Sequence, residues 1–175
     1  MAKLPSDGES ASPPPSKQQM QALVSTTATF LQTLGLDEDI PEDTNKKGAY
    51  DKMMVRGLLK VDRIERGRIT CVFTVKPSLT NPYNTLHGGV VAALTEAMGL
   101  ACAGSVAGDK DFFLGELAMS YLSAARVNEE VEVDGCIVRH GRKVIVTSIE
   151  FRMKQSRKLV YGGRATFYMM PVANL

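Results

Sequence analysis

Hydrophobic and polar residues alternate with a period of two over most of the chain beyond residue 52, which predicts β-strands with one buried face. The alternation begins near Met53 with Val55, Gly57, Leu59 and Val61. A turn at Glu65-Arg66-Gly67 then leads into Ile69–Val75, so we expect a hairpin. Further strands are expected at Phe112–Ser120, Val131–Arg139, Val144–Met153 and Leu159–Tyr168, with His140-Gly141 as a tight turn.

Residues 81–104 break this alternation. A polar, turn-prone lead-in from Asn81 to Thr85 precedes about 17 residues that are almost all small or apolar. Small residues on every side predict a helix that is buried all round and lies in the protein core. Glu96 interrupts the apolar run, and the small residues lack lipid-facing bulk, so we expect no membrane span.

The first 35 residues have a different pattern. Residues 1–15 are rich in Ser and Pro without apolar periodicity, which predicts a disordered tail. Ser16 and Gln19 form a capping box, and apolar residues recur at helical spacing up to Leu34. We therefore expect an N-terminal helix over residues 16–35, packed across the sheet rim or over the substrate entrance.

One long helix between an early hairpin and a run of antiparallel strands predicts an α+β fold, in which a curved sheet wraps around a buried helix. The 175 residues suffice for one such domain with its own core. A net charge of +2 does not favour nucleic acid as a partner. Three widely spaced cysteines and two histidines favour reduced thiols and disfavour a structural zinc site, and we expect no metal.

Two features of the apolar helix suggest chemistry. His87-Gly88-Gly89 stands at its expected start, where exposed N–H groups and the positive end of the helix dipole suit a developing oxyanion. Glu96 is the only ionisable residue within it, and a buried carboxylate is a suitable base for water. Taken singly, His87 could be a cap, the glycines a turn, and Glu96 half of an ion pair.

Together, the spacing Asn-x5-His-Gly-Gly-x7-Glu and the basic hairpin that follows resemble the hotdog-fold acyl-CoA thioesterases of the phenylacetate-pathway and thioesterase-superfamily-member type. The resemblance covers roughly residues 50–170. It implies a hotdog fold and hydrolysis of acyl-CoA to free acid and coenzyme A, in fatty acid metabolism. Coenzyme A is then part of the substrate, and no separate cofactor is expected.

The resemblance also implies a role for each matching residue. The Gly88 N–H would polarise the thioester carbonyl, and Glu96 would act as general base on water, or as nucleophile. Asn81 would hold water or substrate, and His87 would orient the loop near the leaving sulfur. Relatives carry a serine that positions water where this chain has Leu114, so either another group such as Thr95 takes that role, or turnover and mechanism differ.

The substrate has two further expected contacts. Basic residues at one hairpin turn would meet the phosphates of coenzyme A, with Arg126 adding to them; the turn residues are Arg139, His140, Arg142 and Lys143. A solvated turn is the alternative. The acyl chain would lie between the helices of two subunits, against Val90, Val91, Leu94 and Met98.

Helix geometry requires two chains at each site. Gly88 and Glu96 are eight residues apart, which places them about 12 Å apart along the axis and about 80° apart around it. They cannot both reach one carbonyl. The resemblance implies antiparallel helix pairing in a homodimer with shared sites, and further a dimer of dimers.

Two rival functions stay open. A hotdog hydratase or dehydratase uses a histidine in a different motif, and a non-catalytic acyl-CoA-binding module has no need for Glu96. We expect a cytoplasmic protein, with the peroxisome as an alternative because the chain ends in Ala-Asn-Leu.

Overall fold

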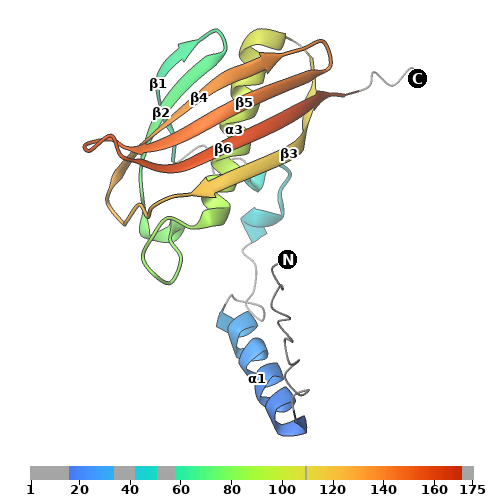
Figure 1. The fold of residues 1–175 in the computed structure, drawn as a ribbon, viewed down its shortest axis with the longest axis vertical. Helices are drawn as coiled ribbons and strands as arrows, with labels where there is room; N and C mark the ends of the chain where they lie inside the picture. The colour runs from blue at the N-terminus through green and yellow to red at the C-terminus, as the bar shows by residue number, and fades with distance from the viewer. Residues whose placement is uncertain (1–15, 34–41, 51–57, 109, 171–175) are drawn as a thin grey trace, which may run out of the picture. The chain divides into compact units, whose positions relative to one another are not determined.

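The computed structural model describes residues 16–33, 42–50, 58–108 and 110–170 (Figure 1). The chain divides into two compact units, residues 1–45 and 46–175. The expected tail at residues 1–15 and the expected start of the first strand near Met53 lie outside the described residues.

The first unit contains helix α1 (Lys17–Thr33) and the short 3-10 helix η1 (Glu42–Asn45). The capping box of α1 is confirmed, because the Ser16 N–H donates to Gln19 Oε1 at 2.8 Å and the Gln19 N–H donates to Ser16 Oγ at 3.3 Å. Apolar side chains along one side of α1 are exposed, including Leu23 and Phe30. Its expected role over the substrate entrance stays a prediction.

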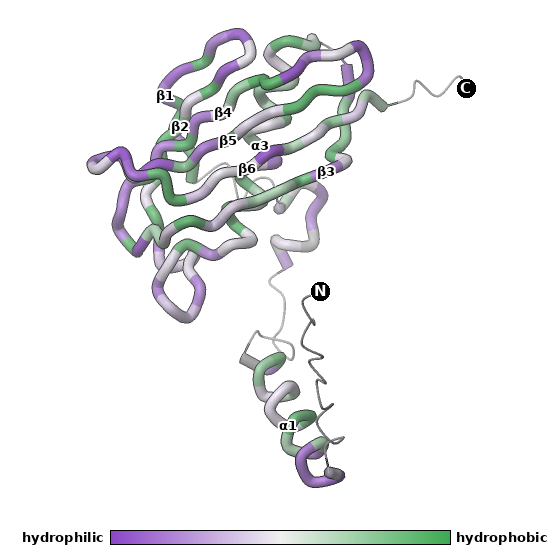
Figure 2. Tube along the Cα trace, in the orientation of Figure 1, coloured by the Kyte–Doolittle hydropathy of each residue, from purple (hydrophilic) through white to green (hydrophobic). Residues whose placement is uncertain are grey.

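The second unit contains a six-stranded antiparallel sheet in the order β1-β2-β4-β5-β6-β3. Its strands are β1 (Lys60–Glu65), β2 (Arg68–Thr74), β3 (Phe112–Tyr121), β4 (Glu130–His140), β5 (Val144–Met153) and β6 (Leu159–Met169). The predicted strands and hairpins are therefore confirmed. Figure 2 shows the alternation of hydrophobic and hydrophilic residues along them.

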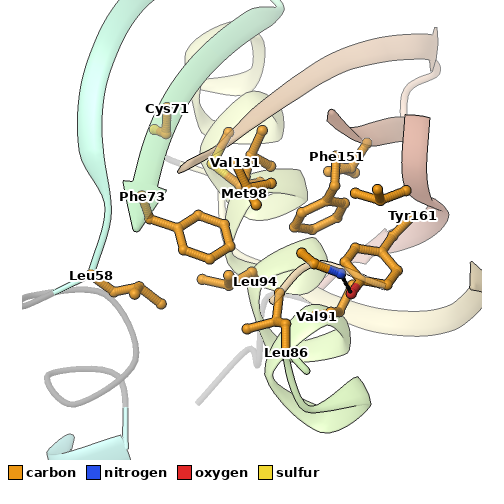
Figure 3. Packing of buried hydrophobic residues seen from close by; sticks show 14 of the residues in the cluster. Leu58, Cys71, Phe73, Leu86, Val91, Leu94, Met98, Val131, Phe151 and Tyr161 are labelled. Atoms are coloured by element: carbon orange, nitrogen blue, oxygen red, sulfur yellow. Dashed lines mark hydrogen bonds between the residues drawn. The ribbon is translucent and has the colours of Figure 1, made fainter. Parts of the chain in front are cut away.

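The long apolar helix is α3 (Gly88–Ala107), which lies against one face of the curved sheet (Figure 1). Side chains from β2, β4, β5 and β6 meet it in the core, among them Phe73 and Phe151, which lie near Leu94 in Figure 3. A curved antiparallel sheet against one long helix is the expected hotdog arrangement. The helix has the length and hydropathy of a membrane span, and in this fold it is the core helix.

Within one chain, α3 is buried along one face only, so the expectation of burial all round is wrong. The buried positions recur at helical spacing and are Val91, Leu94, Thr95, Met98, Gly99, Cys102 and Ala103. The opposite face carries mostly small residues, such as exposed Ala101 and Gly104, together with the larger side chain of exposed Leu100. Two glycines permit the close contact of the buried face with the sheet. A Cβ on Gly99 would lie 2.7 Å from the Phe167 ring, and one on Gly163 would lie 2.6 Å from Thr95 Cγ2.

The structure does not favour a reactive cysteine in the core. Cys71 and Cys102 are buried, and burial raises the pKa of the Cys102 thiol to about 11. A thiol with so high a pKa stays protonated at neutral pH and is a poor nucleophile.

Candidate active site

The lead-in to α3 is a tightly bonded loop. The His87 N–H donates to the Leu79 carbonyl, and the Leu86 N–H donates to the Ala125 carbonyl, each at 2.8 Å. The Tyr161 hydroxyl accepts the Ala125 N–H at 2.9 Å from within the core. The start of α3 is therefore hydrogen-bonded both to the segment after β2, at Leu79, and to the connection between β3 and β4, at Ala125.

His87 is the N-cap of α3, and its Nδ1 accepts the Gly89 N–H at 3.0 Å. A Cβ on Gly89 would lie 3.1 Å from that same Nδ1, so glycine at this position gives the imidazole room to cap the helix. The expected role of His87 in orienting the loop agrees with this geometry.

Gly88 is the first residue of α3, and its N–H is the available donor at this helix end. The N–H groups of Val90 and Val91 both donate to the His87 carbonyl, and the Gly89 N–H donates to His87 Nδ1. Among the described residues, no group accepts a hydrogen bond from the Gly88 N–H. An unpaired N–H at a helix N-terminus can stabilise a developing oxyanion.

A pocket of about 440 Å³ adjoins Gly88. It is lined by Asn81, Thr85, Leu86, Gly88, Tyr121, Leu122, Ser123, Ala124 and Tyr161. Sequence reasoning missed the residues from the end of β3 and from β6. The rim also carries a cation, because Lys158 Nζ donates to Ser123 Oγ at 2.8 Å.

Asn81 lies in this pocket but its side-chain oxygen serves the loop. Asn81 Oδ1 accepts the Tyr83 N–H at 3.0 Å, the Thr85 N–H at 3.2 Å and the Thr85 hydroxyl at 3.1 Å. Only the side-chain amide N–H groups of Asn81 are left to meet water or substrate. The expected contact of Asn81 with water or substrate is therefore restricted to donation.

Glu96 lies outside this pocket, in the middle of α3. Its side chain is partly exposed, so the expected burial is not found within one chain. It makes no hydrogen bond or ion pair with the part of the chain that the structure describes. Gly88 and Glu96 thus face different surroundings, as the eight-residue spacing predicts.

The basic turn between β4 and β5 lies far from Gly88, at the other end of α3. Ile137, near the end of β4, lies close to Gly67 of the β1–β2 turn, since a Cβ on Gly67 would be 3.4 Å from Ile137 Cγ1 and 3.5 Å from Val106 in the last turn of α3. Ser105 Oγ, also at the end of α3, accepts the Gly67 N–H. Gly88, by contrast, lies beside Tyr121 at the end of β3. Figure 1 shows the two ends of α3 at opposite ends of the sheet, and a 20-residue helix is about 30 Å long.

The side chains of the basic turn are exposed and form no ion pair with an acid among the described residues; they are Arg139, His140, Arg142 and Lys143. Several other cations of the domain are paired, such as Arg68 with Asp134 at 2.7 Å and Arg157 with Glu132 at 2.7 Å. The unpaired turn is therefore available to an anion, although at the opposite end of α3 from the Gly88 N–H.

The residues expected to contact the acyl chain lie elsewhere. Val91 and Leu94 are fully buried and Met98 is 3% exposed, all against the sheet, while Val90 packs beside the same core. The expectation that they line a path between two helices is wrong for the three buried residues. Their side chains fill the interior because the small residues of α3 occupy the outward face.

The groups considered for water positioning also differ from expectation. The Thr95 hydroxyl is fully buried and donates to the Val91 carbonyl at 2.9 Å, so it is not available to water in this structure. Leu114 lies near the start of β3 beside a bulge at Gly115, seven residues before Tyr121. At about 3.3 Å per residue, Leu114 is about 23 Å along the strand from Tyr121, which lines the pocket at Gly88.

The fold and the sequence both have known counterparts. Residues 83–160 match the model of the thioesterase superfamily. The chain is 31% identical over 108 residues to an esterase of Caenorhabditis elegans, covering 62% of this chain and 64% of that protein. It is 27% identical over 106 residues to human acyl-coenzyme A thioesterase 13, covering 59% of this chain and 74% of that protein.

A solved structure has the same architecture. Zebrafish thioesterase superfamily member 2 superposes with a TM-score of 0.67 at 22% identity, covering 73% of this chain and 90% of that chain. The expected hotdog fold is thus confirmed. The matched part of this chain spans a little less than two thirds of the nematode protein's length. Residues 83–160 thus resemble the thioesterase superfamily, within a domain that has the hotdog fold.

Proposed function

We propose that this protein hydrolyses acyl-CoA thioesters to the free acid and coenzyme A. The observation that carries the proposal is the Gly88 N–H, a donor at the start of α3 that has no acceptor among the described residues, next to a pocket of about 440 Å³. A thioester carbonyl placed there would receive a hydrogen bond that strengthens as its oxygen becomes negative. The likeness to human acyl-coenzyme A thioesterase 13 supports the choice of substrate class.

The proposed reaction uses a carboxylate and one water. Glu96 takes a proton from water as the water oxygen bonds to the carbonyl carbon, and the Gly88 N–H stabilises the resulting oxyanion. Collapse of this intermediate breaks the carbon–sulfur bond and releases the thiolate of coenzyme A, which takes up a proton. A thiolate is a good leaving group because the pKa of its thiol is near 8.5, so no strong acid is needed.

Two chains are required for this reaction. The Gly88 N–H and Glu96 of one chain are too far apart along α3 to act on one carbonyl, so we propose that each site combines Gly88 of one subunit with Glu96 of the other. The outward face of α3 supports such pairing, since its small residues allow a second helix to approach closely. An acyl chain in this seam would lie against Ala93, Ala97 and Leu100.

The basic turn supports the same arrangement. In an antiparallel pair of α3 helices, the β4–β5 turn of one subunit lies at the end where the other subunit's helix begins. Arg142 and Lys143 would then meet the phosphates of coenzyme A whose thioester lies at the partner's Gly88.

The test of the function is direct. Purified protein, incubated with acyl-CoA of several chain lengths and with phenylacetyl-CoA, is expected to release free coenzyme A, detected with a thiol reagent. Binding of acyl-CoA without thiol release would support a binding module, and addition or loss of water on an enoyl-CoA without thiol release would support a hydratase. Either result would contradict the proposal.

The phosphate contact has its own prediction. Changing Arg142 and Lys143 together to Ala is expected to raise KM for acyl-CoA about 10-fold or more, as expected from the loss of charge-assisted hydrogen bonds. Hydrolysis of the corresponding acyl-pantetheine, which lacks the nucleotide, should be unchanged. Changing Arg63 and Lys60 on β1 to Ala is the matched control. Equal losses on both substrates would show that the turn serves the fold instead.

A further inference from the structure

Tyr121, the last residue of β3, contacts the start of α3 directly. Its hydroxyl donates to the Gly88 carbonyl oxygen at 3.0 Å. Its ring also lies against Gly88, since a Cβ there would be 3.4 Å from Tyr121 Cε1. No sequence motif joins these residues, which are 33 positions apart.

The carbonyl that Tyr121 contacts belongs to a peptide group with a second partner. This Gly88–Gly89 peptide carries the N–H that donates to His87 Nδ1 at 3.0 Å. The Tyr121 hydroxyl, the peptide and the imidazole therefore form one hydrogen-bonded series. A peptide whose oxygen accepts a hydrogen bond is polarised and becomes a better N–H donor, so each bond strengthens the next.

The series determines the state of the imidazole. Because the backbone N–H can only donate, His87 Nδ1 must be an acceptor, and the proton of the neutral ring is on Nε2. The ring orientation and its tautomer are thus set by the Gly89 N–H, which the Tyr121 hydroxyl polarises through the shared peptide.

Tyr121 is itself held in place by the core. Its ring makes an edge contact with Tyr161 at a centroid distance of 5.8 Å, and Tyr161 makes a similar contact with buried Phe151 at 5.9 Å. The Tyr161 ring is 3% exposed, and burial raises the pKa of its phenol. A rigid aromatic row therefore connects the interior of the sheet to the first turn of α3, although Tyr121 is itself half-exposed.

We infer that Tyr121 is a positioning residue for the His87-Gly88-Gly89 helix start, an inference that rests on the thioesterase function proposed above. Its hydroxyl fixes the Gly88–Gly89 peptide, and this peptide fixes the His87 ring beside the donor N–H of Gly88. The Tyr121 hydroxyl acts through the start of α3 and forms no bond to the substrate.

The test is the change of Tyr121 to Phe, which removes one hydroxyl and keeps the ring. We expect kcat for acyl-CoA to fall about 10-fold, the scale of one hydrogen bond, with KM and the thermal midpoint essentially unchanged. Tyr83→Phe is the matched control, because its side chain is 82% exposed on the neighbouring loop and its activity should equal that of wild type.

A second measurement does not depend on catalysis. In protein labelled with [15N]glycine, the Gly89 amide proton should shift upfield in Tyr121→Phe as its bond to His87 weakens, whereas Tyr83→Phe should leave it in place. If wild type hydrolyses no acyl-CoA, the proposed function fails while this shift still tests the series. An unchanged kcat with an unchanged Gly89 resonance would overturn the inference. So would a rise in KM alone, which indicates substrate contact, or a fall of kcat together with the thermal midpoint, which indicates packing.

Discussion

Glu96→Gln is expected to reduce kcat for acyl-CoA hydrolysis by at least about 100-fold, the scale on which a general base contributes. Glu96 is the only acidic or basic residue of α3, and it makes no hydrogen bond or ion pair with the described residues that would explain its presence structurally. The amide has the shape of the carboxylate but cannot take a proton from water. KM should change little, because the amide keeps the size and shape of the carboxylate at the shared site.

The measurement is steady-state hydrolysis by a variant whose fold and oligomeric state match those of wild type. Glu65→Gln is the control, since Glu65 is an exposed carboxylate on β1, paired at 3.6 Å with Arg63 and outside the pocket at Gly88. Its turnover should be that of wild type. Near-normal turnover by a correctly folded Glu96→Gln protein would remove this carboxylate from the mechanism.

The strands and turns of the hotdog domain could be predicted from the sequence because their information is local. Ile69, Cys71 and Phe73 alternate with Arg68, Thr70, Val72 and Thr74 on β2, of which only Val72 is apolar, and the burial of the strand follows that alternation. The capping box at Ser16 and the glycine pair at 88–89 are likewise local signals, which indicated helix starts correctly. Within α1 and α3, such signals specified the element type and its approximate N-terminus.

The orientation of α3 could not be predicted in the same way. Its residues are small or apolar on both sides, so hydrophobic periodicity does not distinguish the face toward the sheet from the face toward a partner. Val91, Leu94 and Met98 were expected at the subunit seam for this reason, although they fill the core. Side-chain size would have been a partial guide, because Val91, Leu94 and Met98 face the sheet, whereas Ala101 and Gly104 face outward.

Contacts between distant segments were the other part that the sequence did not reveal. Tyr121 meets Gly88 only because β3 ends beside the start of α3, and Tyr161 reaches Ala125 only through the register of β6. Such pairs depend on the packing of the whole domain. The predicted site residues were therefore those within one motif, and the residues that hold the motif in place came from the fold.

The central claim is that each site combines Gly88 of one chain with Glu96 of another, and complementation between two inactive variants tests it. Gly88→Pro removes the donor N–H. The structure makes this a mild change to the helix, because Gly88 is the first helical residue, where proline is favoured. The preceding residue, His87, already has the φ of −64° and ψ of 132° that a following proline requires.

The decisive measurement is the activity of a mixture of Gly88→Pro and Glu96→Gln proteins after subunit exchange. Random exchange makes about half of the dimers mixed, each with one intact site of two, so activity should rise from near zero to about a quarter of wild type. Wild type mixed equally with the Gly88→Pro, Glu96→Gln double variant should fall to about a quarter, whereas sites within single chains would leave about half. Two results together would contradict the shared site. The Gly88→Pro and Glu96→Gln proteins, shown to fold and to exchange subunits, would stay inactive when mixed, and wild type mixed with the double variant would keep about half of its activity.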